Sequence, residues 1–244
     1  MQKLNNKHIV ITGGTSGIGL ELVKSLASDN HIIVISKKGE LPNELQSACS
    51  SVTLYHANLA KKDEIELVFD KIQRQYTSID VLINNAAVQY TAEFLADDFC
   101  YDSIQTEVDI NFTAICHLSY LFLPMLMLSE NAHIINVNSG LAIAPKKESA
   151  VYCATKSALD SFSKSLSYQL EGTRIKVGQV FLPLVETPMT KGREAGKLSA
   201  EYVARRIING LSRNTEFVDI GKVRWLRFIN YIAPRLARYI MKAG

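Results

Sequence analysis

The sequence feature that most constrains the fold is a short apolar run that ends in a cluster of glycines. Residues 8–12, His-Ile-Val-Ile-Thr, are rich in β-branched side chains and too few for a helix, which is typical of a buried strand in a parallel sheet. Glycines follow at positions 13, 14 and 17, and residues 19–28 then have helical periodicity. A strand, a tight turn and a helix in this order predict the first unit of a doubly wound sheet.

The same alternation recurs along the chain. Because strands alternate with helices, the sequence predicts βαβ units and a parallel sheet that helices cover on both faces. We therefore expect an α/β fold with a single Rossmann-type, doubly wound parallel sheet of about seven strands. The other predicted strands are 31–36, 52–57, 80–83, 132–138, 174–180 and 216–221, and the other predicted helices are 41–49, 61–75, 99–128, 149–171 and one that begins after Ser199 as its N-cap.

The cysteines and the N-terminal residues indicate a cytoplasmic protein. Residues 1–7 are polar and lack the apolar run of a secretory leader. The longest apolar stretch, 113–128, is shorter than the roughly 20 residues that span a bilayer, so we expect a buried or interfacial helix there. Reduced thiols are expected, with neither disulfides nor a metal site, because no C-x-x-C pair occurs among Cys49, Cys100, Cys116 and Cys153.

The glycine-rich turn lies where a doubly wound sheet binds a dinucleotide. Glycines permit a tight turn and a close approach of the backbone to a pyrophosphate, and the free N–H groups at the start of the next helix attract its charge. The alternative is a tight connection without a ligand, but the position within a βαβ unit favours the nucleotide. The residues expected to contact the dinucleotide here are Gly13, Thr15, Ser16, Gly17, Ile18 and Gly19.

The end of the second strand indicates which dinucleotide binds. Ser36-Lys37-Lys38 stands where an NAD site usually places Asp or Glu against the ribose 2′-hydroxyl. A carboxylate would repel a 2′-phosphate whereas an ammonium attracts it, so Ser36 and Lys37 predict NADP(H) in preference to NAD(H). The alternative is that both lysines belong to a solvated loop.

Five separated motifs resemble those of the short-chain dehydrogenase/reductase family and occur in its order over residues 7 to about 190. They are Thr12-Gly13-x-x-x-Gly17-Ile18-Gly19, Asn84-Asn85-Ala86-Ala87, Asn111, Ser139 and Tyr152-x-x-x-Lys156. Within the family, residues 136–142, 151–156 and 183–188 look most similar to the DltE-type oxidoreductases. The resemblance implies hydride transfer between nicotinamide and a carbonyl or alcohol carbon.

Four residues form the expected catalytic set. Tyr152 and Lys156 are four apart on a predicted helix and share a face, where the ammonium should favour the phenolate and lower the pKa of Tyr152. Tyr152 is then the general acid for carbonyl reduction and the base for alcohol oxidation, and Ser139 can donate to the substrate oxygen. The resemblance adds that Lys156 binds the nicotinamide ribose beside Tyr152, and that Asn111 holds a water connecting Lys156 to solvent. Each residue taken singly has an ordinary structural alternative to a catalytic role. Tyr152 and Lys156 could be surface packing on a helix, Ser139 could cap the element after its strand, and Asn111 could be a local distortion of a helix.

The resemblance implies further cofactor contacts, with three departures from the family pattern. Asn58 replaces a frequent Asp beside the adenine, where a carboxamide can still donate and accept hydrogen bonds. Ala87 replaces a usual Gly near the ribose, and Leu184 replaces a frequent Gly near the nicotinamide. The contacts implied are Asn58, Leu59, Asn85, Ala86, Pro183, Val185 and Thr187.

We expect residues 1–221 to form the NADP-binding domain, with a mobile substrate lid at about 184–198, and residues 222–244 to be a basic amphipathic extension of the same domain. Residues 222–242 carry six Lys/Arg and no Asp/Glu, which leaves −3 for the rest of a chain whose net charge is +3. This composition suits an anionic membrane surface, although packing over the substrate pocket or at a subunit interface is favoured. No nucleic-acid-reading motif accompanies the basic residues.

The expected function is NADP(H)-dependent transfer of a hydride to or from an apolar or amphipathic carbonyl compound. The alternative is a non-catalytic NADP(H)-sensing protein, but a sensor has no need of a proton donor. Helices 113–128 and 149–171 are expected to form the interfaces of a homodimer or homotetramer. An apolar pocket lining is expected from Leu141, Ala142, Ile143 and Leu184, and an acidic substrate could instead be recognised by Lys146, Lys147 and Arg193, for which solvated loop charge is the favoured alternative.

Overall fold

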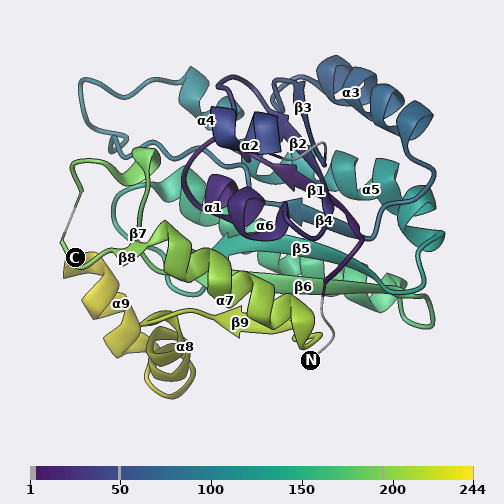
Figure 1. The fold of residues 1–244 in the computed structure, drawn as a ribbon. Coiled ribbons are helices and arrows are strands. Elements are labelled where there is room, and N and C mark those ends of the chain that lie inside the picture. The colour runs from purple at the N-terminus through teal and green to yellow at the C-terminus, as the bar shows by residue number, and fades with distance from the viewer. Residues whose placement is uncertain (1–3, 49–50, 194, 244) are drawn as a thin grey trace.

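A seven-stranded parallel sheet forms the centre of the computed structural model, which describes residues 4–48, 51–193 and 195–243. The strand order β3-β2-β1-β4-β5-β6-β9 places the switch in winding direction between β1 and β4 (Figure 1). The expected doubly wound α/β sheet is thus confirmed. The strands are β1 (His8–Thr12), β2 (His31–Ser36), β3 (Val52–His56), β4 (Val81–Asn84), β5 (Ala132–Ser139), β6 (Ile175–Leu182) and β9 (Phe217–Asp219).

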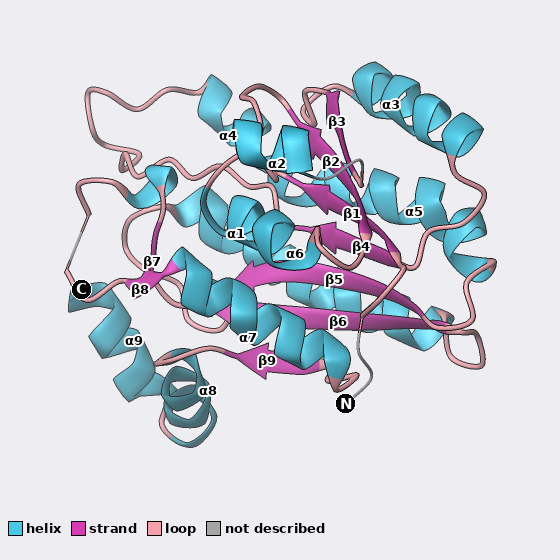
Figure 2. Ribbon diagram, viewed as in Figure 1, coloured by secondary structure: helices cyan, strands magenta, loops and turns pink. Residues whose placement is uncertain are grey.

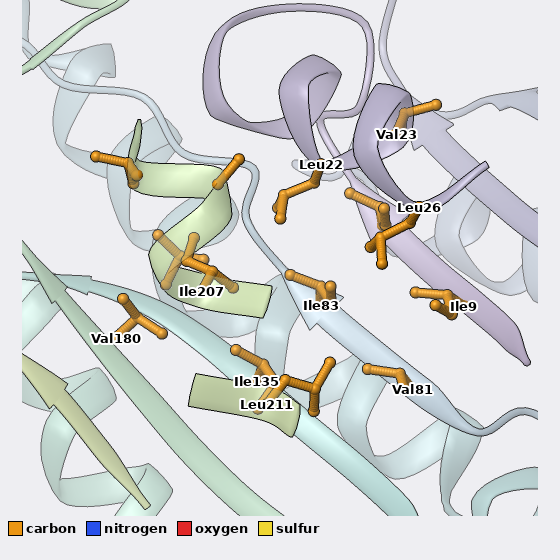
Figure 3. Packing of buried hydrophobic residues seen from close by; sticks show 14 of the residues in the cluster. Ile9, Leu22, Val23, Leu26, Val81, Ile83, Ile135, Val180, Ile207 and Leu211 are labelled. Atoms are coloured by element: carbon orange, nitrogen blue, oxygen red, sulfur yellow. The ribbon is translucent and has the colours of Figure 1, made fainter. Parts of the chain in front are cut away.

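Helices cover both faces of this sheet, with the strands between them (Figure 2). The period of two sends Ile9 and Ile11 of β1 to one face and Val10 to the other, and all three side chains are fully buried. On the first face the sheet packs against α1 (Gly17–Leu26) and α7 (Ala200–Ser212), whose contacts are shown in Figure 3. On the second face it packs against α3 (Lys62–Gln75), α5 (Ala114–Met127) and α6 (Ala150–Gln169).

The range 99–128, in which helices are expected, holds one continuous helical stretch of three parts. These are α4 (Asp102–Val108), a π-helical turn (Asp109–Thr113) and α5. By length and composition alone, Asp102–Met127 could cross a membrane. Leu118, Phe122 and Leu126 are nevertheless fully buried against the second face of the sheet, so α5 packs as the core helix expected.

Element boundaries differ from the predictions by a few residues. The first helix begins at Gly17 rather than residue 19, and α2 (Asn43–Ala48) begins at residue 43 rather than 41. Ser199 caps α7 as predicted, because its hydroxyl accepts a hydrogen bond from the backbone N–H of Tyr202 at 3.2 Å. The free thiols among the described residues are Cys100, Cys116 and Cys153, whereas Cys49 lies outside the described residues.

The segment expected as a substrate lid contains short regular elements. β7 (Val185–Glu186) and β8 (Leu198–Ser199) pair in parallel, and a 3-10 turn (Pro188–Thr190) follows β7. The Thr190 hydroxyl donates to the Val185 carbonyl oxygen at 2.5 Å. The pairing of β7 with β8 therefore ties the two ends of the segment together.

The basic C-terminal residues form two helices, α8 (Val223–Ile232) and α9 (Pro234–Ala243). They lie beyond β9 at one corner of the fold, at the yellow end of the chain in Figure 1. Arg227 joins this pair to the sheet, because its guanidinium contacts both oxygens of Asp219 at 2.7 and 2.8 Å and lies 4.4 Å from the Phe181 ring centroid.

Candidate active site

The glycine-rich turn packs directly against the end of β4. Gly13 has a φ of +69°, and a Cβ added to it would lie 3.1 Å from the Cα of Ala86. A Cβ on Gly19 would lie 2.2 Å from the Gly13 carbonyl oxygen. Thr12 and Asn85 tie the turn down, since the Asn85 amide donates to the Thr12 carbonyl oxygen at 2.9 Å. Only glycine fits these positions, and the bare backbone leaves a cradle at the start of α1 that suits a pyrophosphate.

A cavity of about 1100 Å³ extends from this cradle along the carboxyl ends of β1, β4, β5 and β6. It brings together most of the residues that the sequence predicts for the site. Three of them do not line it: Thr15, Gly19 and Asn111. The predicted residues that do are Gly13, Ser16, Gly17, Ile18, Ser36, Lys37, Asn58, Leu59, Asn85, Ala86, Ser139, Tyr152, Lys156, Pro183, Val185 and Thr187.

Thr15 lies behind the cavity wall and supports the loop that carries Lys37. Its hydroxyl is 2.8 Å from the Ser36 hydroxyl and donates to the Lys38 carbonyl oxygen at 3.1 Å. Thr15 does not line the cavity, and its direct contact with a dinucleotide stays a prediction. These hydrogen bonds instead fix the turn after β2, at whose tip Lys37 is exposed at the cavity.

The expected catalytic side chains converge at the carboxyl end of β5. Tyr152 and Lys156 are one turn apart on α6, and the Lys156 Nζ lies 5.6 Å from the Tyr152 ring centroid. Lys156 is buried, and its Nζ donates to the Val137 carbonyl oxygen at 2.9 Å. Ser139 ends β5, and its hydroxyl oxygen accepts from the Leu141 N–H at 3.2 Å. The same hydroxyl forms a hydrogen bond with Tyr152, so Ser139 and Tyr152 lie together at the cavity.

Burial dominates the electrostatics of this cluster. It lowers the pKa of Lys156 to about 8 and raises the pKa of Tyr152 to about 12. Smaller effects oppose the shift at Tyr152, because a hydrogen bond with Ser139 and the charge of Arg193 both lower its pKa. The expectation that Lys156 depresses the Tyr152 pKa is therefore wrong in this structure, since desolvation exceeds every favourable contact of the phenol.

A glycine cradle, a tyrosine–lysine pair on one helix and a serine at a strand end also occur together in known proteins. A family model described as short chain dehydrogenase matches residues 7–198. The chain is a short-chain dehydrogenase/reductase. It is 34% identical over 235 residues to the protein named "Uncharacterized oxidoreductase DltE" of Bacillus subtilis (strain 168), with 92% of each chain covered. The similarity to DltE-type oxidoreductases is thus confirmed.

Solved structures share the fold of this short-chain dehydrogenase/reductase. A Burkholderia phymatum member in complex with NAD aligns with a TM-score of 0.87 and 17% identity, covering 98% of this chain and 97% of that one. A Burkholderia cenocepacia member in complex with NADP aligns with a TM-score of 0.86 and 18% identity, covering 99% of each chain. Proteins of this fold therefore bind either dinucleotide.

Asn111 of this short-chain dehydrogenase/reductase lies in the π-helical turn and is fully buried. Its side-chain oxygen accepts from the Val88 N–H at 2.9 Å, and its side-chain nitrogen donates to the Val88 carbonyl oxygen at 2.9 Å. A longer contact of 3.3 Å joins it to the Thr155 hydroxyl on α6. The amide thus fixes the 88–90 loop, which forms part of the cavity wall, against the helix that carries Tyr152.

Two further polar contacts of the site were not found by sequence reasoning. Gln89 joins Arg193 of the 184–198 segment to Ser149 at the start of α6, through hydrogen bonds of 2.5 and 3.1 Å. Glu107 is buried, accepts a hydrogen bond from the Tyr90 N–H at 2.8 Å, and has its pKa raised by burial. Its position four residues before Asn111 is the only sequence signal that could have indicated it.

The apolar wall of the cavity differs in part from the expectation. Leu141 and Leu184 line it as predicted, but Ala142 and Ile143 do not. The C-terminal segment also contributes to the wall, because Trp225, Leu226 and Ile229 of α8 line the cavity. The favoured prediction that this segment packs over the pocket is therefore supported by its position. Within the described ranges no cluster of His, Cys, Asp or Glu could hold a metal ion.

Proposed function

We propose that this short-chain dehydrogenase/reductase is an NADP(H)-dependent reductase of an apolar or amphipathic carbonyl compound. The observation that carries the proposal is the convergence of Ser139, Tyr152 and Lys156 on the same cavity as the glycine cradle. That arrangement supports a proton donor beside a dinucleotide site. The protein would work in the cytoplasm.

The cradle fits a nicotinamide dinucleotide. Gly13, Ser16, Gly17 and Ile18 would hold its pyrophosphate, because they line the cavity at the start of α1, where a helix has free backbone N–H groups. When bound, the dinucleotide supplies or accepts the hydride. The other residues assigned to it are Asn58 and Leu59 for the adenine, Asn85, Ala86, Tyr152 and Lys156 for the ribose side, and Pro183, Val185 and Thr187 for the nicotinamide side.

The side chains of the cluster suit reduction. A tyrosine whose pKa is about 12 keeps its proton at neutral pH, so Tyr152 is ready to donate it to an oxygen that gains negative charge. Ser139 would stabilise that oxygen with its hydroxyl proton. Lys156 would hold a positive charge beside Tyr152, and Asn111 would keep a water in the path between Lys156 and solvent.

The preference for NADP(H) rests on the loop after β2. Lys37 is exposed at the cavity, whereas the Glu64 carboxylate accepts the Asn58 N–H at 2.7 Å and pairs with Lys61 at 3.1 Å. A 2′-phosphate would therefore meet an ammonium, and the nearby carboxylate is already engaged. Lys37→Asp should reverse the preference between NADPH and NADH by about tenfold or more in kcat/KM. Lys38→Asp is the matched control, because it makes the same charge change at a residue that does not line the cavity.

The side chains that line the cavity indicate the class of substrate. Leu141, Leu184, Trp225, Leu226 and Ile229 give the far end of the cavity an apolar lining, which favours a substrate with a hydrocarbon part. Lys146 pairs with Glu148 at 3.3 Å, whereas Arg193 keeps its positive charge because its partner Gln89 is neutral. One such cation beside an apolar wall favours an amphipathic substrate.

We also propose a homodimer or homotetramer. Tyr120, Met127 and Tyr168 expose large apolar surface on α5 and α6, as a face that a second copy covers would do.

The decisive experiment is NADPH oxidation with a panel of carbonyl compounds of increasing chain length. Tyr152→Phe should lower kcat by about a hundredfold or more while NADPH still binds, because only the donated proton is lost. Tyr168→Phe on the exposed side of the same helix is the control. A non-catalytic NADP(H) sensor would bind NADPH and reduce nothing, and equal rates in Tyr152→Phe and the parent would refute Tyr152 as the acid.

A further inference from the structure

The hairpin of α8 and α9, residues 222–243, exposes a strip of large apolar side chains. Five residues make it up: Trp225, Phe228 and Ile232 on α8, and Leu236 and Ile240 on α9. Their exposed fractions run from 44% to 59%. Spacings of three or four residues align them along one side of each helix. Five large exposed apolar side chains on one hairpin indicate a face that meets another apolar phase or molecule.

Charge surrounds this strip and has one sign. Lys222, Arg224, Arg235, Arg238 and Lys242 are exposed, and the hairpin contains no Asp or Glu. Arg227 is the exception among its cations, because it turns inward to Asp219. An amphipathic helix with apolar and aromatic residues on one side and Lys/Arg at its flanks is suited to the interface of an anionic bilayer.

The position of the hairpin connects this face to the cavity. Trp225 and Ile240 are both exposed to solvent and counted among the residues that line the cavity of Tyr152. α8 and α9 project from the corner of the fold beyond β9 and away from α3 and α5 (Figure 2). A planar surface that met the hairpin would therefore meet one rim of the cavity.

We propose that the α8–α9 hairpin docks this protein on anionic phospholipid surfaces, with Trp225, Phe228, Ile232, Leu236 and Ile240 in the acyl–headgroup boundary and the flanking Lys/Arg against the lipid phosphates. The proposal does not depend on the NADP(H) preference or on turnover. A second copy of the chain is a poorer occupant, because hairpins related by a twofold axis would bring like charges together. An anionic bilayer supplies the opposite charge.

The chain carries its own probe for this surface. Trp225 is the only tryptophan and is 59% exposed, so tryptophan emission, unlike that of the ten tyrosines, reports on the hairpin alone. The full-length protein is mixed with vesicles of phosphatidylglycerol and phosphatidylcholine, or of phosphatidylcholine alone, and is followed by co-sedimentation and by Trp emission. We expect binding and a blue shift with the anionic vesicles only, and loss of both at about 1 M salt.

Matched double variants separate the local surface from general charge and hydrophobicity. Arg235→Gln with Arg238→Gln, and separately Phe228→Ser with Ile232→Ser, should each weaken partitioning by about tenfold or more. Two distant pairs are controls and should change it less than about twofold. These are Arg74→Gln with Arg213→Gln, which makes the same charge change, and Leu67→Ser with Leu95→Ser, which removes two exposed apolar side chains outside the hairpin.

Three results would overturn the proposal. One is the absence of co-sedimentation with anionic vesicles at low salt. Another is equal weakening by the hairpin variants and their controls. The third is a Trp225 emission that is blue-shifted without vesicles and moves to the red on dilution, while the sedimentation coefficient falls. That result would show that a second copy of the chain covers the strip. Loss of NADPH oxidation activity has no bearing on any of these readouts.

Discussion

Replacing Lys156 by Met should stabilise the fold while removing activity. Burial lowers the pKa of Lys156 from 10.5 to about 8, which corresponds to about 3 kcal/mol of unfavourable free energy in the charged folded state. Methionine has a similar length and no charge, so that cost disappears. The lost hydrogen bond from Nζ to the Val137 carbonyl oxygen costs about 1 kcal/mol. A net gain of about 2 kcal/mol at pH 7 should raise Tm by about 4–8 °C.

The pH dependence of this gain tests its cause. Below about pH 8 both the folded and the unfolded chain hold the Lys156 proton, and the full cost is present. Between about pH 8 and 10.5 the unfolded chain binds more protons, so the wild type gains stability and the advantage of Lys156→Met should vanish. Urea unfolding at pH 7 and pH 10 measures both values, with Lys62→Met on the exposed surface of α3 as control. A variant less stable than the wild type at pH 7 would refute the reasoning.

Two further predictions concern the same site. The kcat/KM for carbonyl reduction should stay level at neutral pH and fall above about pH 8, because Lys156 then loses its positive charge. A profile that stays level to roughly pH 9.5 would mean that this charge is not needed. Gly19→Ala should lower the free energy of unfolding by about 1–3 kcal/mol and weaken NADPH binding, because the new Cβ would lie 2.2 Å from the Gly13 carbonyl oxygen. Thermal unfolding measures the first effect and calorimetric titration with NADPH the second. Parental values in the variant would show that the turn relaxes at no cost.

The strands, the two cores and the cradle could be predicted because their signals are local. A β-branched run such as 31–36 identifies a buried strand wherever it lies, and glycines between a strand and a helix identify the turn. Tyr152 and Lys156 share a face for the same reason, since four residues make about one helical turn. Local spacing also placed Ser139 at a strand end. Nothing beyond the backbone geometry of neighbouring residues was needed.

The sequence by itself determined the doubly wound sheet and the residue types at its carboxyl edge, whereas the tertiary structure alone decided how those residues are solvated and supported. Thr15 and Asn111 lie behind the cavity wall, Gln89 bridges to Arg193 over 104 positions, and the Tyr152 pKa rises instead of falling. Each outcome depends on which distant segments exclude water from a side chain, and desolvation is a property of packing that no local pattern contains. The C-terminal hairpin follows the same rule, because its composition predicts an amphipathic surface but only the fold sets that surface at the rim of the cavity.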